Sequence, residues 1–144
     1  MSHARRSRPP ADVAVGYAAD AHGFGIAYAT ISSGAASGVV RLPFRITPLP
    51  VLEGRDAGYA AVAVVTAHLK SRGVGRVRLR LADGKVVSEL AGEAAPPKAL
   101  TMPYVRTRCL LHGLGTVRLE MADAADVRDL TRRAVASLTL HSAA

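Results

Sequence analysis

The sequence predicts a mixed α/β domain in which three strands come first and later strands alternate with helices. Three observations support this fold class. Residues 12–47 hold three segments in which large apolar residues alternate with small or polar ones, which is the period of a strand. Two later segments alternate in the same way. Helical patterns lie before, between and after these two segments, so we expect a mixed five-stranded sheet with helices on both faces.

The first three strands are expected at residues 12–19, 24–33 and 39–47. The first two carry Gly and Ala at alternate positions, so each has a face of small side chains against which a helix can pack closely. Pro43 has no N–H to donate to a neighbouring strand, which favours an edge position for the third strand.

The middle of the chain has the strongest helical pattern. Apolar residues repeat at helical spacing over 53–72, and Gly73 is placed to end that helix. Residues 75–82 predict a fourth strand with Val and Leu on one face and Arg on the other. Asp83 follows this strand and is placed to cap a short helix that runs to about residue 91.

The last third of the chain predicts a helix at 98–113, a fifth strand at 116–121 and a final amphipathic helix at 123–138. The alternation in the fifth strand points its apolar residues, Met121 included, toward the core. Cys109 lies in an apolar run of the preceding helix, and we interpret it as a core thiol.

Length and composition limit the class of protein. We expect a basic arm (1–11), one domain (12–139) and a short tail (140–144). No apolar run approaches the ~18 residues needed to span a bilayer, and the first ten residues are too polar for a signal peptide. We therefore expect a cytoplasmic protein without a membrane partner. A single cysteine excludes an internal disulfide framework.

The charge of the chain favours a polyanionic partner. Nineteen basic residues, sixteen of them Arg, stand against eleven acidic ones and give a net charge of +8. Such a surface attracts nucleic acid whatever its sequence, although the base composition of a GC-rich genome also explains an excess of Arg. The chain has no Asn or Gln, the side chains that read adenine edges, so contacts to phosphates are expected rather than base reading.

Four stretches taken in order resemble the ribonuclease H fold, specifically the type I and reverse-transcriptase-like branch, over residues 12–138. The stretches are HGFGIAY, GYAAVAVVTAHLKSRG, RVRLRLADGKVVSELAGE and RDLTRRA. The resemblance implies strand order 3-2-1-4-5, with the second strand antiparallel to its neighbours. It also implies a chemistry, because family members hydrolyse the RNA strand of RNA–DNA hybrids with two divalent metals held by four carboxylates. Two dications close together need several carboxylate groups around them.

This sequence matches the family's carboxylates at one position of four. Asp83 falls on the fourth-strand aspartate, although a residue between strand and helix is more often a cap, and alone it would hold hydrated Mg²⁺ only weakly. The first-helix glutamate falls on Gly58 and the last-helix aspartate on Arg128. The first-strand aspartate falls near Gly16 or Ala18. The general-acid/base histidine of the family has no counterpart in the stretch MADAADV.

Two groups of Arg have alternative interpretations. Arg128 is either a solvated helix residue or a group that compensates charge where a metal would bind and holds a phosphate with two hydrogen bonds. The row Arg76, Arg78 and Arg80 either pairs with Asp126 and Asp129 of the last helix or forms a phosphate-binding face.

Three functions follow from these observations. The leading hypothesis is a catalytically inactive ribonuclease H-like domain that binds hybrid or duplex nucleic acid without a cofactor, through Arg128, Lys85, Arg132, Arg5, Arg6 and Arg8. The second is a nuclease dependent on Mg²⁺ or Mn²⁺ with a rearranged site made of Asp20, Asp83, and Asp56 or Asp126. The third is a protein-interaction module that forms a homodimer through an exposed strand or helix.

Overall fold

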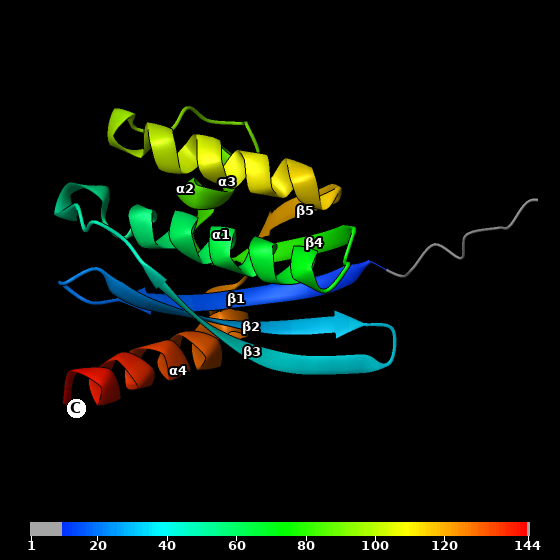
Figure 1. Cartoon of the computed structure of the whole chain (residues 1–144), viewed down its shortest axis with the longest axis horizontal. Helices are drawn as coiled ribbons and strands as arrows, with labels where there is room; N and C mark the ends of the chain where they lie inside the picture. The colour runs from blue at the N-terminus through cyan, green and yellow to red at the C-terminus, as the bar shows by residue number, and fades with distance from the viewer. Residues whose placement is uncertain (1–9, 144) are drawn as a thin grey trace, which may run out of the picture.

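The computed structural model describes residues 10–143 and places five strands in one sheet (Figure 1). The strands and helices, in chain order, are β1 (Ala11–Ala19), β2 (Phe24–Ser33), β3 (Ala36–Arg45), α1 (Arg55–Ser71), β4 (Arg76–Leu81), α2 (Gly84–Leu90), α3 (Thr101–Leu114), β5 (Thr116–Met121) and α4 (Ala124–Ala143). Short 3₁₀ helices precede α1 and α3 at Pro50–Leu52 and Lys98–Leu100.

The sheet has the order β3-β2-β1-β4-β5, with β2 antiparallel to β1 and β3, and with β4 and β5 parallel to β1 and to each other. This confirms the topology that the resemblance implied. It also confirms the edge position of the strand that contains Pro43.

Some element bounds differ from the predicted ones. The third strand begins at Ala36 rather than at residue 39, because a tight turn with Gly34 at φ 61° lets Ala36 pair directly with Ser33. It ends at Arg45 rather than at 47. The last helix continues to Ala143, beyond the end of the amphipathic pattern. The arm residues 1–9 lie outside the described part of the chain.

Helices cover the two faces of the sheet unequally (Figure 1). Helices α1, α2 and α3 lie on one face, whereas α4 packs on the other, against β1 and β2. The small-residue faces permit this, as predicted: a Cβ at Gly16 of β1 would stand 2.5 Å from the Thr131 backbone nitrogen of α4. The small residues of β2, Ala27 and Ala29, lie in the core on the α1 side.

Two predicted core residues are exposed. Met121 is 67% exposed, because it ends β5 at the edge of the sheet, so the inward orientation predicted for it is wrong. Cys109 is also exposed, since α3 turns Thr107, Leu111 and Leu114 toward the interior instead. Between residues 10 and 143, no helix combines the length and the apolar character that a membrane span requires.

Candidate functional site

The position that the resemblance assigns to the first-helix glutamate is closed by neighbouring side chains. Gly58 is the fourth residue of α1 and is buried. A Cβ there would stand 2.8 Å from the Tyr17 hydroxyl oxygen and 2.7 Å from Cγ2 of Val86. Because both distances are shorter than real Cβ contacts, no larger side chain fits at residue 58 while Tyr17 and Val86 keep their places.

Tyr17 is the residue of β1 that faces this position. Gly16 faces α4 instead, and Ala18, two residues further on, shares its side of the strand. A carboxylate expected at Gly16 or Ala18 would therefore lie on the opposite side of β1 from Gly58. Burial raises the pKa of the Tyr17 hydroxyl, and the nearby carboxylates of Asp83 and Asp56 raise this pKa further. The hydroxyl is therefore neutral at physiological pH.

Asp83 caps α2. Its Oδ1 accepts hydrogen bonds from the backbone N–H groups of Lys85 at 3.0 Å and Val86 at 3.3 Å. This confirms the capping interpretation and commits one carboxylate oxygen to the helix end. Across residues 10–143, no three His, Cys, Asp or Glu side chains are grouped so that they could hold a metal ion. The residues present therefore do not fit the pair of metals used by the family.

The structure brings two of the other candidate acids together. Asp20 and Asp56 line a cleft of about 420 Å³ with Tyr17, between the end of β1, the start of α1 and α4. Asp20 accepts backbone hydrogen bonds from the turn that follows it, at 2.9 and 3.0 Å, and Asp56 accepts one from Leu49 at 3.0 Å. Both carboxylates thus hold local backbone. Asp126 lies in the first turn of α4 and does not line this cleft.

The candidate phosphate-binding residues lie on the surface. Arg128 and Arg132 are exposed on α4, one turn apart, and no described acid pairs with either. Lys85 is exposed, with its Nζ 4.0 Å from Glu53 Oε2. The arm residues Arg5, Arg6 and Arg8 lie outside the described residues.

The Arg row of β4 pairs with acids of the sheet and not with the last helix. Arg78 Nε donates to Glu120 at 2.6 Å, Arg78 Nη1 donates to Asp12 at 3.4 Å, and Arg80 Nε donates to Asp12 at 3.1 Å. The pairing with Asp126 and Asp129 is therefore wrong for Arg78 and Arg80. The reason is that α4 packs over β1 and β2 and leaves the outer face of β4 and β5 open.

A buried polar cluster between α1 and α2 was not predicted. The Tyr59 hydroxyl donates to Glu89 Oε1 at 2.6 Å, and Arg55 Nη1 donates to Glu89 Oε2 at 2.9 Å. Glu89 is only 4% exposed and Tyr59 is fully buried. The one sequence signal was the placement of Glu89 three residues after Val86, on the apolar side of the short helix.

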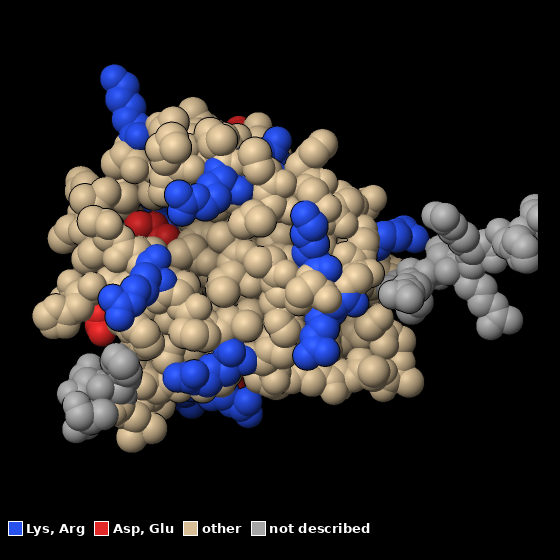
Figure 2. All heavy atoms as spheres, viewed as in Figure 1, with Lys and Arg blue, Asp and Glu red and all other residues tan. Residues whose placement is uncertain are grey.

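Basic side chains surround the face of the molecule that carries α1 and α3. Figure 2 shows Lys and Arg at many places around this face and Asp and Glu at only a few. An excess of cations on a surface attracts polyanions, and the attraction does not depend on nucleotide sequence.

Comparisons with known proteins agree on the fold. No family model and no curated protein matches the sequence. The N-terminal RNase H domain of a Mycobacterium tuberculosis protein matches with a TM-score of 0.73 at 14% identity, covering 94% of this chain and 99% of that one. RNase H1 of Halobacterium salinarum matches with a TM-score of 0.65 at 20% identity, covering 88% and 92%.

A third similar structure is that of LC11-RNase H1 in complex with an RNA/DNA hybrid. Its TM-score is 0.68 at 11% identity, and the match covers 90% of this chain and 99% of that chain. Each match covers most of this chain and most of the other chain, and together with the sheet topology the three matches show that the chain has the ribonuclease H-like fold.

Proposed function

We propose that this chain is a ribonuclease H-like domain that binds hybrid or duplex nucleic acid through phosphate contacts and does not hydrolyse it. The main observation behind the proposal is the close packing of side chains around Gly58. Where the resemblance assigns a glutamate, the Tyr17 hydroxyl and the Val86 side chain fill the space instead. A protein that kept a two-metal site would need room for a carboxylate there.

The remaining acid supports the same conclusion. A pair of divalent cations needs several carboxylates, and stabilising both the attacking and the leaving oxygen needs both cations. Asp83 is the one matched acid, and one of its oxygens accepts two backbone hydrogen bonds at the start of α2. The Tyr17 hydroxyl beside it is neutral and cannot replace a negatively charged ligand.

The exposed guanidinium groups of α4 are suited to binding phosphate. Arg128 and Arg132 lie four residues apart on α4, so their guanidinium groups emerge from the same side of the helix. A guanidinium group can hold a phosphate with two parallel hydrogen bonds. The complex of LC11-RNase H1 with an RNA/DNA hybrid supports a nucleic-acid partner for this fold.

The test is a fluorescence-anisotropy titration of labelled hybrid and duplex at several salt concentrations. Arg128→Ala should weaken binding to unrelated sequences equally and flatten the slope of log K against log salt by about 0.9 or less. Arg133→Ala is the matched control, because it removes the same charge from a different side of α4. Absence of wild-type binding near ~100 mM salt, where phosphate contacts still attract, would contradict the proposal.

A metal-dependent nuclease is the second candidate, and one observation favours it. Asp20 and Asp56 line one cleft with Tyr17, whose pKa responds to Asp83 and Asp56. We expect no cleavage of an RNA–DNA hybrid with Mg²⁺ or Mn²⁺. Cleavage that is lost in both Asp83→Asn and Asp56→Asn would overturn the proposed function and favour the rearranged site.

A further inference from the structure

The edge strand β5 has backbone groups that point away from the sheet. The backbone N–H of Thr116 donates to Gly75 at 3.0 Å, and that of Ala122 donates to Leu81 at 2.6 Å, so even-numbered residues face the β4 side. Backbone groups of successive strand residues point in opposite directions. The N–H and C=O groups of residues 117, 119 and 121 therefore point outward, where the described part of the chain has no further strand.

The side chains of β5 are complementary to themselves. The strand reads TVRLEM, so antiparallel pairing of two copies centred on Leu119 places Arg118 opposite Glu120 of the other copy. The outward direction of the Leu119 backbone makes the two Leu119 residues a hydrogen-bonded pair. The Arg118–Glu120 pairs are then non-hydrogen-bonded pairs, in which side chains approach most closely.

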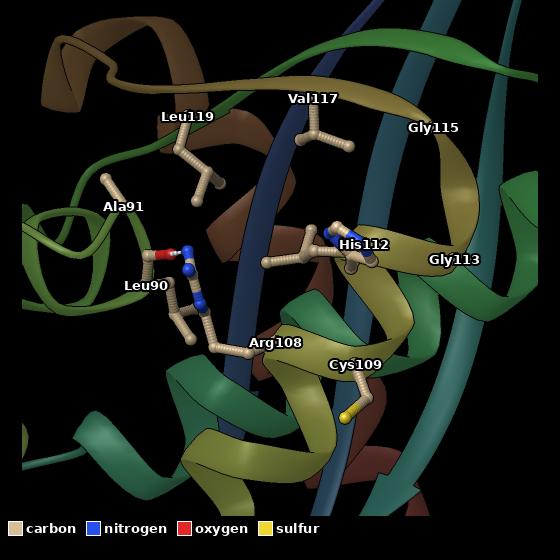
Figure 3. A pocket seen from close by; sticks show the side chains of 10 residues that line it. Leu90, Ala91, Arg108, Cys109, His112, Gly113, Gly115, Val117 and Leu119 are labelled. Carbon is tan, nitrogen blue, oxygen red and sulfur yellow. Dashed lines mark hydrogen bonds between the residues drawn. The ribbon is translucent and has the colours of Figure 1, made fainter.

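A hollow of mixed character lies beside the same edge. It has a volume of about 590 Å³ and lies between β5 and α3, with Val117 and Leu119 from the strand on one side and Leu111, Arg108 and His112 from the helix on the other (Figure 3). Met121 is 67% exposed, and in the antiparallel pairing it stands opposite Val117 of the other copy. A second copy would therefore cover apolar side chains that the monomer leaves in water.

The opposite edge of the sheet lacks these properties. Strand β3 contains Arg41 and Arg45 but no acidic residue, so pairing it with itself brings together only positive charges. Pro43 also removes one backbone donor. Edge strands commonly avoid association through such features, and β5 has neither of them.

We propose that two copies of this chain associate through antiparallel pairing of β5 with β5, about a two-fold axis at Leu119. The two sheets then form one continuous sheet, and each contact occurs twice, as in other isologous dimers. This inference goes beyond the proposed function and does not depend on nucleic-acid binding.

The test is sedimentation equilibrium of the full chain without nucleic acid. The wild type should dimerise, and Arg118→Glu should raise the dissociation constant about tenfold or more, because two attractive pairs become repulsive. The double variant Arg118→Glu/Glu120→Arg should restore the dimer, since residue 118 of each copy again lies opposite the other copy's residue 120 of opposite charge. Arg133→Glu on α4 makes the same charge change away from β5 and should leave the dissociation constant unchanged.

Hydrogen exchange gives an independent measurement. The amides of Val117, Leu119 and Met121 should exchange more slowly as protein concentration rises. Met121→Pro removes an outward N–H without removing a bond to β4, so it should abolish the dimer at unchanged secondary structure. A wild type that stays monomeric at high concentration, or a dimer that neither Arg118→Glu nor Met121→Pro weakens, would overturn the proposal.

Discussion

This molecule has two clusters of paired Arg and acidic side chains, one of them buried and the other exposed to water. Glu89 accepts from Arg55 and Tyr59 between α1 and α2, and only 5% of its side chain is exposed. On the open face of the sheet, Arg78 pairs with Asp12 and Glu120, and 48% of its side chain is exposed. Removing one partner of a buried pair strongly lowers the free energy of unfolding, whereas an exposed pair typically contributes about 0–1 kcal/mol to it. Removing one member of the buried cluster should therefore destabilise the fold, whereas charges that can meet a ligand must be sought on the surface.

The largest expected effect is that of Glu89→Ala. This change leaves the Arg55 guanidinium and the fully buried Tyr59 hydroxyl without their carboxylate. Removing one partner of a buried ion pair destabilises a protein by about 3–5 kcal/mol. Urea unfolding followed by circular dichroism measures the loss. A loss below about 1 kcal/mol would mean that water replaces the carboxylate and that the cluster behaves like an exposed one.

The second prediction concerns high pH. Burial raises the pKa of Tyr59, and its hydrogen bond to Glu89 raises it further, so the folded protein keeps this hydroxyl protonated longer than the unfolded chain does. The unfolded chain loses the proton at about pH 10, and the free energy of unfolding should therefore fall as the pH rises above that value.

Tyr59→Phe tests both the hydrogen bond of this hydroxyl at neutral pH and its titration at high pH. It should lower the free energy of unfolding at neutral pH by about 1.5–3 kcal/mol, the usual contribution of a hydrogen bond to a charged group. It should also flatten the decline above about pH 10. Unfolding curves of both proteins between neutral pH and about pH 11 measure this, and equal slopes would argue against the role of Tyr59.

The sequence predicted those features that follow from local periodicity. Alternation located the strands, and Pro43 and Asp83 took the predicted edge and capping positions. The side of β1 that meets Gly58 was harder to predict, because a shift of one residue moves a strand position to the other face. Tyr17 therefore became apparent as the neighbour of Gly58 only in three dimensions.

Long-range packing explains the remaining differences. Alternation predicted that the Arg row of β4 shares a face, but not that α4 would stop short of that face. The helix that contains Glu89 has seven residues, which is too short for a periodic pattern to locate its buried side. Its burial depends on Tyr59 and Arg55, which lie on another helix.

The smallest expected effect on stability is that of Asp12→Asn on the open face. Asp12 accepts from both Arg78 and Arg80, but 40% of its side chain is exposed and water screens both pairs. The urea midpoint should stay within the error of the measurement.

The variant nevertheless removes the carboxylate charge beside Arg78 and Arg80, while Arg78 keeps its pair with Glu120, which makes it a sensitive test of where nucleic acid binds. If the site is at Arg128 on α4, the affinity for duplex should change little. A marked gain in affinity for Asp12→Asn, with no loss for Arg128→Ala, would move the nucleic-acid surface from α4 to the open face of β4 and β5.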